Sequence, residues 1–193
     1  TDKLYYQNEL NRMVAQIYCE QEDYANAEKY YTQYISQAST ASDEEYFKLA
    51  YCQYQQAKIT EAIVNLEEVA ISESDVSQHS AYLLGLCYLK NGDKTKAYNV
   101  LQQSKPFISD PVRNELIDFT LAKLSYEKGD DQTAMSNLTS FARQYPQSEN
   151  VNEANELLAF LNIKYDNFND AVIVMNKLKN ISYNLKRVYQ KAN

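Results

Sequence analysis

Residues that interrupt helices are scarce in this sequence. Its 193 residues include three glycines, three prolines and no tryptophan. Average usage of about 7% glycine and 5% proline would give roughly 23 glycines and prolines in all. A turn-rich β-sandwich or barrel needs far more tight turns, and collagen and flexible linkers need far more of both residues. Because 45% of the residues are hydrophobic and 23% are charged, as is ordinary for globular proteins, we expect a folded and mostly helical chain.

Basic residues are outnumbered by acidic ones. The chain has 19 Lys and Arg against 26 Asp and Glu, a net charge of −7. This balance disfavours nucleic acid as a partner, because Lys and Arg drive phosphate binding. Residues 171–193 nevertheless contain five basic residues and no Asp or Glu, so residues 1–170 carry −12. The simpler interpretation of this basic end is a solvated helix terminus, where the helix dipole favours cations. The alternative is a docking surface for an acidic segment.

Long apolar runs are also missing. No run approaches the 18 residues that a membrane-spanning helix needs, so direct membrane insertion is not expected. The chain opens with Thr1, Asp2 and Lys3, without an initiator Met or a signal-type apolar stretch. These features favour a processed chain or a fragment of a longer one.

An internal repeat runs through the whole chain. Alanines recur at intervals of 35, 35, 37 and 37 residues, namely Ala27, Ala62, Ala97, Ala134 and Ala171. Twelve residues before each of them stands a small residue, namely Ala15, Ala50, Gly85, Ala122 and Ala159. Two antiparallel helices pack closely only where facing side chains are small, so the pattern predicts five helical hairpins. Large apolar residues around these positions would fill the space between stacked hairpins.

The third copy carries the clearest motif. Residues 81–88 have the sequence AYLLGLCY, Asn91-Gly92-Asp93 follows as a turn, and Ala97 lies in the next helix. This copy resembles the tetratricopeptide repeat (TPR), a helix–turn–helix unit of 34 residues. The resemblance covers about residues 1–180. It implies an all-α protein, a right-handed superhelical solenoid of about five TPR hairpins followed by a C-terminal helix.

We expect one array over residues 1–193. Its repeats are predicted at 8–41, 43–76, 78–111, 115–149 and 152–180, with an incomplete sixth repeat beginning at 181–193. The turns inside the hairpins are predicted near 21–23, 57–59, 91–93, 129–131 and 165–167, and an eleventh helix near 181–191. Ser42 with Glu45 predicts a capping box, and Asp110 before Pro111 predicts a helix start.

Residues suited to catalysis are few. His79 is the single histidine, so a paired-histidine metal motif cannot form, and nothing suggests a catalytic triad. We expect His79 to be an exposed or half-exposed polar residue. Cys19, Cys52 and Cys87 contain no C-x-x-C pair and, being odd in number, suggest no disulfide framework. Cys52 and Cys87 share a repeat position that is apolar in the other copies, which predicts small core residues. We therefore expect no enzymatic activity, no metal and no cofactor.

The surface of the first helix of each hairpin is the candidate binding site. In TPR arrays these helices line a concave groove with a stripe at i, i+4 and i+7. The matching positions here predict a partner-binding groove of Phe47, Tyr51, Tyr54, Tyr82, Leu86, Phe119, Lys123, Tyr126 and Phe160. Aromatic residues are enriched at protein interfaces, and tyrosine adds a polar tip. Alternatively, several of these side chains pack between neighbouring helices, or another copy or domain covers them. The cations Arg12 and Lys123 stand at distant repeats, which disfavours the carboxylate clamp that the family uses for chaperone tails.

Two functions remain open. The first is a non-catalytic scaffold that binds a partner protein, peptide or helix in this groove. The second is a regulatory or substrate-recruiting region of a larger enzyme or of a secretion or assembly machine, with self-association or contact to the remaining chain. Residues 141–148, FARQYPQS, resemble a junction of bacterial envelope TPR proteins. This likeness predicts a periplasm-facing envelope location, with the cytoplasm as the alternative.

Overall fold

The computed structural model describes residues 2–38, 41–69 and 74–192. Over these residues the chain forms eleven α-helices and one short 3-10 helix, without any strand. The predicted all-α class is therefore confirmed. The chain divides into two compact units, Thr1–Ile108 (unit 1) and Ser109–Asn193 (unit 2).

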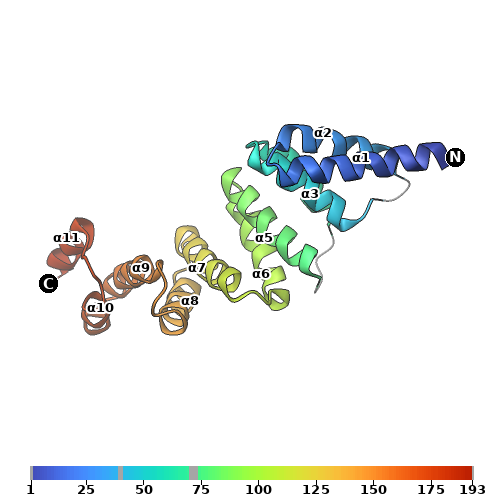
Figure 1. Cartoon of the computed structure of the whole chain (residues 1–193). Helices are drawn as coiled ribbons and strands as arrows, with labels where there is room; N and C mark the ends of the chain where they lie inside the picture. The colour runs from blue at the N-terminus through green and yellow to red at the C-terminus, as the bar shows by residue number, and fades with distance from the viewer. Residues whose placement is uncertain (1, 39–40, 70–73, 193) are drawn as a thin grey trace. The chain divides into compact units, whose positions relative to one another are not determined.

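Unit 1 consists of three helical hairpins. Each pairs consecutive helices, and α2 and α4 also contact the first helix of the following hairpin (Figure 1). Its elements are α1 (Asp2–Glu20), α2 (Tyr24–Gln37), α3 (Asp43–Gln55), α4 (Ile59–Glu67), α5 (Asp75–Lys90), α6 (Lys94–Ser104) and the 3-10 helix η1 (Lys105–Phe107).

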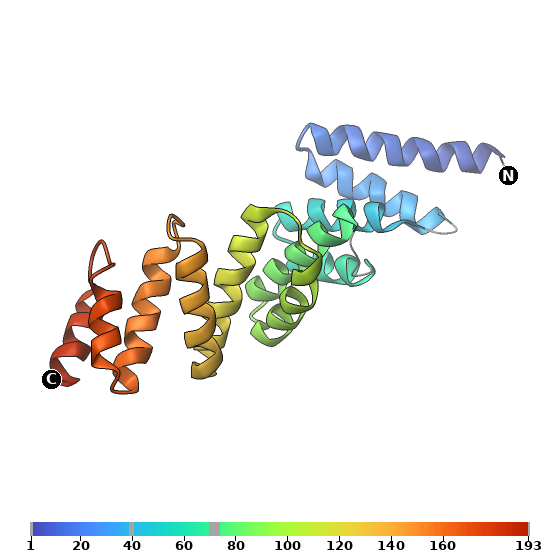
Figure 2. The same ribbon diagram turned by 90° about the horizontal axis from the view of Figure 1, so that it is seen from below.

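Unit 2 consists of two hairpins and a last helix. Its elements are α7 (Pro111–Lys128), α8 (Asp131–Gln144), α9 (Val151–Lys164), α10 (Phe168–Met175) and α11 (Tyr183–Ala192). Helices α7 to α10 stand side by side in chain order (Figure 2), and α11 packs on α9. In both units the turns inside the hairpins fall where the alanine spacing predicts them, and α11 matches the predicted eleventh helix.

The small residues of the repeat lie at the centre of each hairpin. The five aligned alanines are completely buried, and so are Ala15, Ala50, Ala122 and Ala159. Gly85 is also buried, and a Cβ atom added there would lie 2.6 Å from Cδ2 of Leu101 on α6. This close approach explains why the third hairpin has glycine at the crossing.

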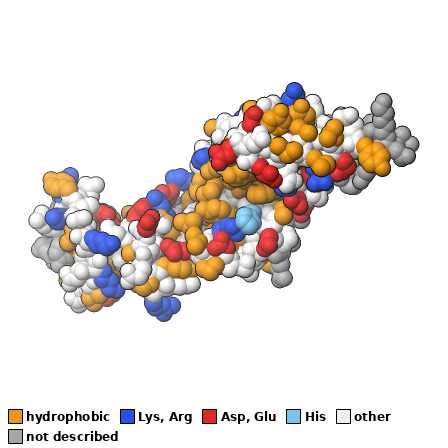
Figure 3. All heavy atoms as spheres, in the orientation of Figure 1, with side chains coloured by type: hydrophobic (Ala, Val, Ile, Leu, Met, Phe, Trp, Pro, Cys, Tyr) orange, Lys and Arg blue, Asp and Glu red, His pale blue; other side chains and the backbone are white. Residues whose placement is uncertain are grey.

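One repeat position differs between the first hairpin and the others. Cys52, Cys87, Leu124 and Leu161 are buried, whereas their counterpart Ile17 is 52% exposed. Cys52 packs against the first hairpin, but no hairpin precedes Ile17 among the described residues. Ile17 therefore belongs to an exposed apolar row along α1, visible at the upper right of Figure 3. The row consists of Tyr6, Leu10, Met13 and Ile17.

The predicted helix starts are confirmed. Asp110 caps α7, its carboxylate accepting a hydrogen bond from the Val112 backbone N–H, and Pro111 is the first helical residue. Ser42 and Glu45 form the capping box of α3. In three hairpins an aspartate caps the second helix, and these aspartates are Asp23, Asp93 and Asp130.

All five hairpin turns contain one residue in the left-handed region, always five residues before the aligned alanine. In two turns it is a glycine, Gly92 or Gly129, with φ of 83° and 81°. In the other three it is Glu22, Ala57 or Asp166, with φ of 59° to 60°. The backbone of the turn is thus the same whether or not a glycine is present.

No helix in the described parts of the chain is long and apolar enough to cross a membrane.

Candidate functional site

The candidate site in unit 1 is a surface formed by two neighbouring helices. Helix α3 carries Phe47, Tyr51 and Tyr54 at i, i+4 and i+7, which places them on one side of the helix. Helix α5 carries Tyr82 and Leu86 at i and i+4, and the two helices are in contact. All five side chains are half-buried. These five residues are called the α3–α5 aromatic face below.

Contacts of aromatic rings link α3 to α5 at this face. The Phe47 ring centroid lies 6.3 Å from that of Tyr51 and 6.1 Å from that of His79 on α5. At the other end of α3, Nζ of Lys90 on α5 lies 4.2 Å from the Tyr54 ring centroid, a distance suited to a cation–π interaction. The face is therefore bridged at both ends by contacts between α3 and α5.

Tyr24 of α2 extends the face. Its ring meets the Tyr51 ring edge-on, with the centroids 6.0 Å apart. Burial and the neighbouring Tyr51 raise the pKa of the Tyr24 hydroxyl above its ordinary value, so this phenol is neutral at physiological pH. The tyrosines of this surface combine the apolar area of a ring with a hydroxyl group that can form hydrogen bonds.

Three residues that contact this face, Tyr24, His79 and Lys90, are absent from the groove predicted from the sequence. Two of them show a signal at helical spacing, since His79 precedes Tyr82 by three residues and Lys90 follows Leu86 by four. His79 is exposed as predicted, and its Nδ1 lies 2.6 Å from the backbone oxygen of Asp75. No group of three or more His, Cys, Asp or Glu side chains within the described residues could hold a metal ion.

The four predicted groove residues of unit 2 are engaged in internal contacts. Phe119 is only 8% exposed, and its ring lies 5.3 Å from that of Phe141 in the core. Nζ of Lys123 lies 2.7 Å from the Glu153 carboxylate and 5.9 Å from the centre of the Phe119 ring. Tyr126 and Phe160 are half-buried against the same core. The structure thus brings five of the nine predicted residues together on unit 1 and the other four within unit 2.

The three cysteines are free thiols. Cys52 and Cys87 are completely buried, which confirms them as core residues. The structure also brings Cys19 and Cys52 together, with their Sγ atoms 3.9 Å apart. Burial and the neighbouring Cys19 raise the pKa of the Cys52 thiol, so it is protonated at neutral pH.

Comparison with known families identifies the repeat. A family model described as the tetratricopeptide repeat matches residues 79–104 and 118–148, which contain most of α5–α6 and α7–α8. These two segments of the chain are tetratricopeptide repeats. No curated protein sequence matches this TPR chain significantly.

Solved structures share the fold of this chain. The crystal structure of YrrB, described as a TPR protein with an unusual peptide-binding site, aligns with a TM-score of 0.68 at 14% identity. The alignment covers 94% of this TPR chain and 88% of YrrB. A crystal structure of MamA aligns with a TM-score of 0.69 at 14% identity, over 95% of this chain and 92% of MamA. At such identities the likeness shows the fold alone.

Proposed function

We propose that this TPR protein is a non-catalytic interaction scaffold that binds an apolar segment of a partner protein on the α3–α5 aromatic face. The observation that carries the proposal is the continuity of this face. Five half-buried large side chains from two adjoining helices form it, and the Phe47 ring contacts Tyr51 on α3 and His79 on α5. Aromatic residues of this kind supply most of the binding energy in protein interfaces.

The chemistry of the face favours a neutral or basic apolar ligand. Its rings are uncharged, and Lys90 and His79 stand at its ends. The remaining surface of residues 1–170 is acidic, which disfavours the approach of an acidic partner. Because contact would be mainly apolar, the affinity should depend only weakly on salt.

A peptide or a helix is the class of ligand that fits this face. The i, i+4, i+7 spacing on α3 presents a ridge against which the apolar stripe of a partner helix can pack. The peptide-binding site named for YrrB, which shares this fold, supports a peptide as the ligand.

A second candidate function is supported by the apolar row on α1. Leu10, Met13 and Ile17 are each more than half exposed, which is unusual for three consecutive positions of one helical stripe. Contact with further protein would cover them. This row favours a repeat region that serves a larger enzyme or a secretion or assembly machine, through its parent chain or another copy.

We also propose a location in the bacterial cell envelope, facing the periplasm, with the cytoplasm as the alternative. The support is the likeness of residues 141–148 to the envelope junction. The first and fifth residues of this segment, Phe141 and Tyr145, pack ring against ring at 5.2 Å.

The test uses peptides selected from a displayed random library on the intact chain. We expect Tyr51→Ala and Tyr82→Ala each to weaken binding by about 2 kcal/mol, or roughly 30-fold. The matched control is Lys186→Glu with Arg187→Glu on α11, which should leave the affinity unchanged. Fluorescence anisotropy measures binding, and circular dichroism verifies that each variant is folded. Loss of binding in the charge reversals, with normal binding by both tyrosine variants, would reject the aromatic face.

A further inference from the structure

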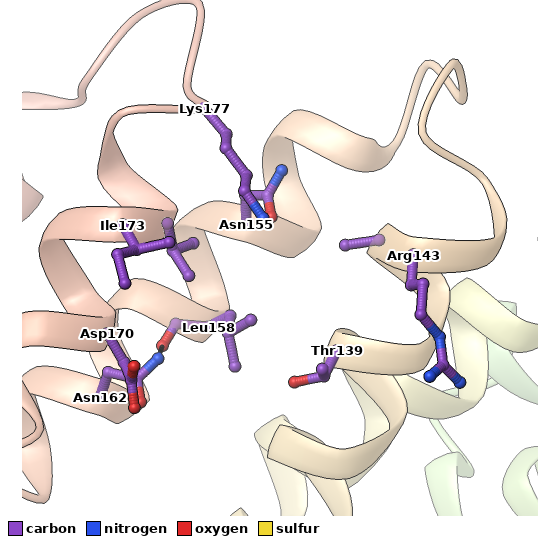
Figure 4. Close-up of a pocket in the computed structure, with 10 residues that line it drawn as sticks. Thr139, Arg143, Asn155, Leu158, Asn162, Asp170, Ile173 and Lys177 are labelled. Atoms are coloured by element: carbon purple, nitrogen blue, oxygen red, sulfur yellow. Dashed lines mark hydrogen bonds between the residues drawn. The ribbon is translucent and has the colours of Figure 1, made fainter.

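Unit 2 contains a groove on helices that the aromatic face does not use. A cavity of about 500 Å³ lies between α8 and α10, with α9 as its floor (Figure 4). Asn155, Leu158 and Asn162 of α9 line the floor. Thr139 and Arg143 of α8 line the wall that faces α10. A second hollow of about 330 Å³ adjoins the cavity, since Ala142, Asn155 and Lys177 line both. These two hollows are called the α8–α10 groove below.

The repeat register explains why this groove is open. The TPR pattern places aromatic residues four positions before and three positions after the small residue at the helix crossing. The first three repeats of this chain each keep a tyrosine at one of these two positions, and these are Tyr18, Tyr46 and Tyr88. The fourth repeat has Asp118 and Ser125 at these positions, and the fifth has asparagine at both, namely Asn155 and Asn162. The shorter amides leave room that a tyrosine ring would fill.

Both amides are buried and have unused hydrogen-bonding capacity. Asn155 is 5% exposed, and its side chain makes no hydrogen bond to any residue that the structure describes. Asn162 is 4% exposed, and its Nδ2 donates to the Leu158 backbone oxygen at 3.0 Å, which leaves its Oδ1 to accept. Both side chains line the cavity, so their unused amide atoms can pair with a ligand that enters it.

The spacing of the two amides matches an extended peptide. They are seven residues apart on α9, which is two helical turns or roughly 10 Å. An extended chain rises about 3.3 Å per residue, so this distance spans about three peptide residues. An amide both donates and accepts, as a peptide group requires. Leu158 lies between the two amides and offers an apolar seat for one side chain.

The charges around the groove are mainly positive. Arg143 and Lys177 form no ion pair with any described residue, and Figure 4 shows the Lys177 side chain extending toward Asn155. Lys179 lines the adjoining hollow, where its backbone N–H donates to Oδ1 of Asn152 at 3.0 Å. The single acid in the lining is Asp170, on α10 and near Asn162. With three cations and one acid in its lining, the groove favours an acidic ligand. Lys177 and Lys179 lie at the end of the groove near Asn155.

We propose that the α8–α10 groove is a second binding site, which takes a short extended acidic peptide. Asn155 and Asn162 pair with its backbone, and an apolar side chain rests on Leu158. One or two carboxylates of the peptide then meet Lys177 and Lys179 beyond Asn155. This site is independent of the aromatic face, which favours neutral or basic ligands.

The probe is a positional library of acetylated, amidated six-residue peptides, bound to the immobilised full chain. We expect the selected peptides to carry Asp or Glu at one end and an apolar residue two or three positions away. Asn155→Tyr restores an aromatic residue at the open position and should abolish binding. Lys177→Glu with Lys179→Glu should weaken binding of the selected peptides by ~10-fold or more, because charge complementarity is reversed.

Two controls keep the result specific to the groove. Lys186→Glu with Arg187→Glu makes the same charge change on α11 and should leave the affinity unchanged. Tyr51→Ala alters only the aromatic face and should also have no effect. Three results would each overturn the proposal. They are selection of peptides without an acidic preference, equal binding by the Asn155→Tyr variant, and binding of free acidic amino acids but not of peptides.

Discussion

The two units use the same repeat position in opposite ways. Tyr82 in unit 1 and Phe119 in unit 2 both stand three residues before the small residue of their hairpin. Tyr82 is half-buried and part of a surface, whereas Phe119 packs on Phe141 inside the core. Unit 2 instead opens a polar groove on α9, where the repeat pattern places rings. The comparison shows that the same repeat position can be part of the surface or part of the core. The side chains of neighbouring helices determine which of the two it is.

The largest expected difference is in the stability lost when the ring of Phe119 or of Tyr82 is removed. Phe119→Ala removes a core ring and should destabilise unit 2 by about 3–5 kcal/mol. Tyr82→Ala removes a partly exposed ring and should cost about 1 kcal/mol. Urea unfolding followed by circular dichroism measures both free energies of unfolding. Equal losses would remove the distinction between the two units at this position.

A smaller effect is expected at the helix crossing. Gly85→Leu should destabilise unit 1 by about 1–3 kcal/mol, because its new atoms collide with Leu101. In unit 2 the corresponding residue is Ala122, which already carries a Cβ atom, as do Ala15 and Ala50 in unit 1. Gln103→Leu, at an exposed position of α6, is the control for adding a leucine to this hairpin and should be nearly neutral. A Gly85→Leu variant with the wild-type melting temperature would contradict the close approach of α5 and α6 at Gly85.

The smallest effect is a pH dependence at one repeat position of unit 1. Burial alone would raise the pKa of Glu28, but hydrogen bonds from Lys58 and Gln56 outweigh it and hold the pKa below 4.5. Nζ of Lys58 lies 2.5 Å and Nε2 of Gln56 lies 2.8 Å from the carboxylate. In unit 2 the equivalent positions are Met135 and Val172, which cannot titrate.

The stabilisation from Glu28 is therefore complete above its unfolded pKa and is lost as the pH falls through the lower, folded value. Glu28→Gln should cost unit 1 up to about 1 kcal/mol at pH 7, and the two proteins should converge at an acidic pH below the folded pKa of Glu28. Urea midpoints at the two pH values test this. A constant difference would show that the carboxylate does not carry the effect.

The hairpins could be predicted from sequence because their determinants are local and repeated. The spacing from Ala27 to Ala171 was sufficient to place all five turns, since only small residues fit where the helices cross. The exposure of Phe119 could not be predicted in this way, because it depends on Phe141 in another helix. Cys19 and Cys52 stand at different positions of their repeats, so aligning equivalent positions does not pair them.

The candidate site was predicted in part. Periodicity placed the five residues of the α3–α5 aromatic face on two helices that the structure shows to be in contact, because surface residues of a helix recur every three or four positions. It missed Tyr24, which approaches Tyr51 from α2. The α8–α10 groove also escaped prediction, since it arises from the absence of rings at Asn155 and Asn162. An absence of this kind becomes visible only when the neighbouring helices are in place.

The left-handed turn residues have a consequence for how the hairpins open. A left-handed conformation costs a residue other than glycine roughly 1 kcal/mol, so Glu22, Ala57 and Asp166 adopt it only while the helices on either side are packed. When such a hairpin frays, its turn residue leaves the left-handed region and this conformational free energy is regained. Fraying at Gly92 or Gly129 regains no comparable free energy, because glycine adopts this conformation readily. Fluctuations should therefore concentrate in the first, second and fifth hairpins, and backbone amides should exchange with solvent most slowly in the third and fourth.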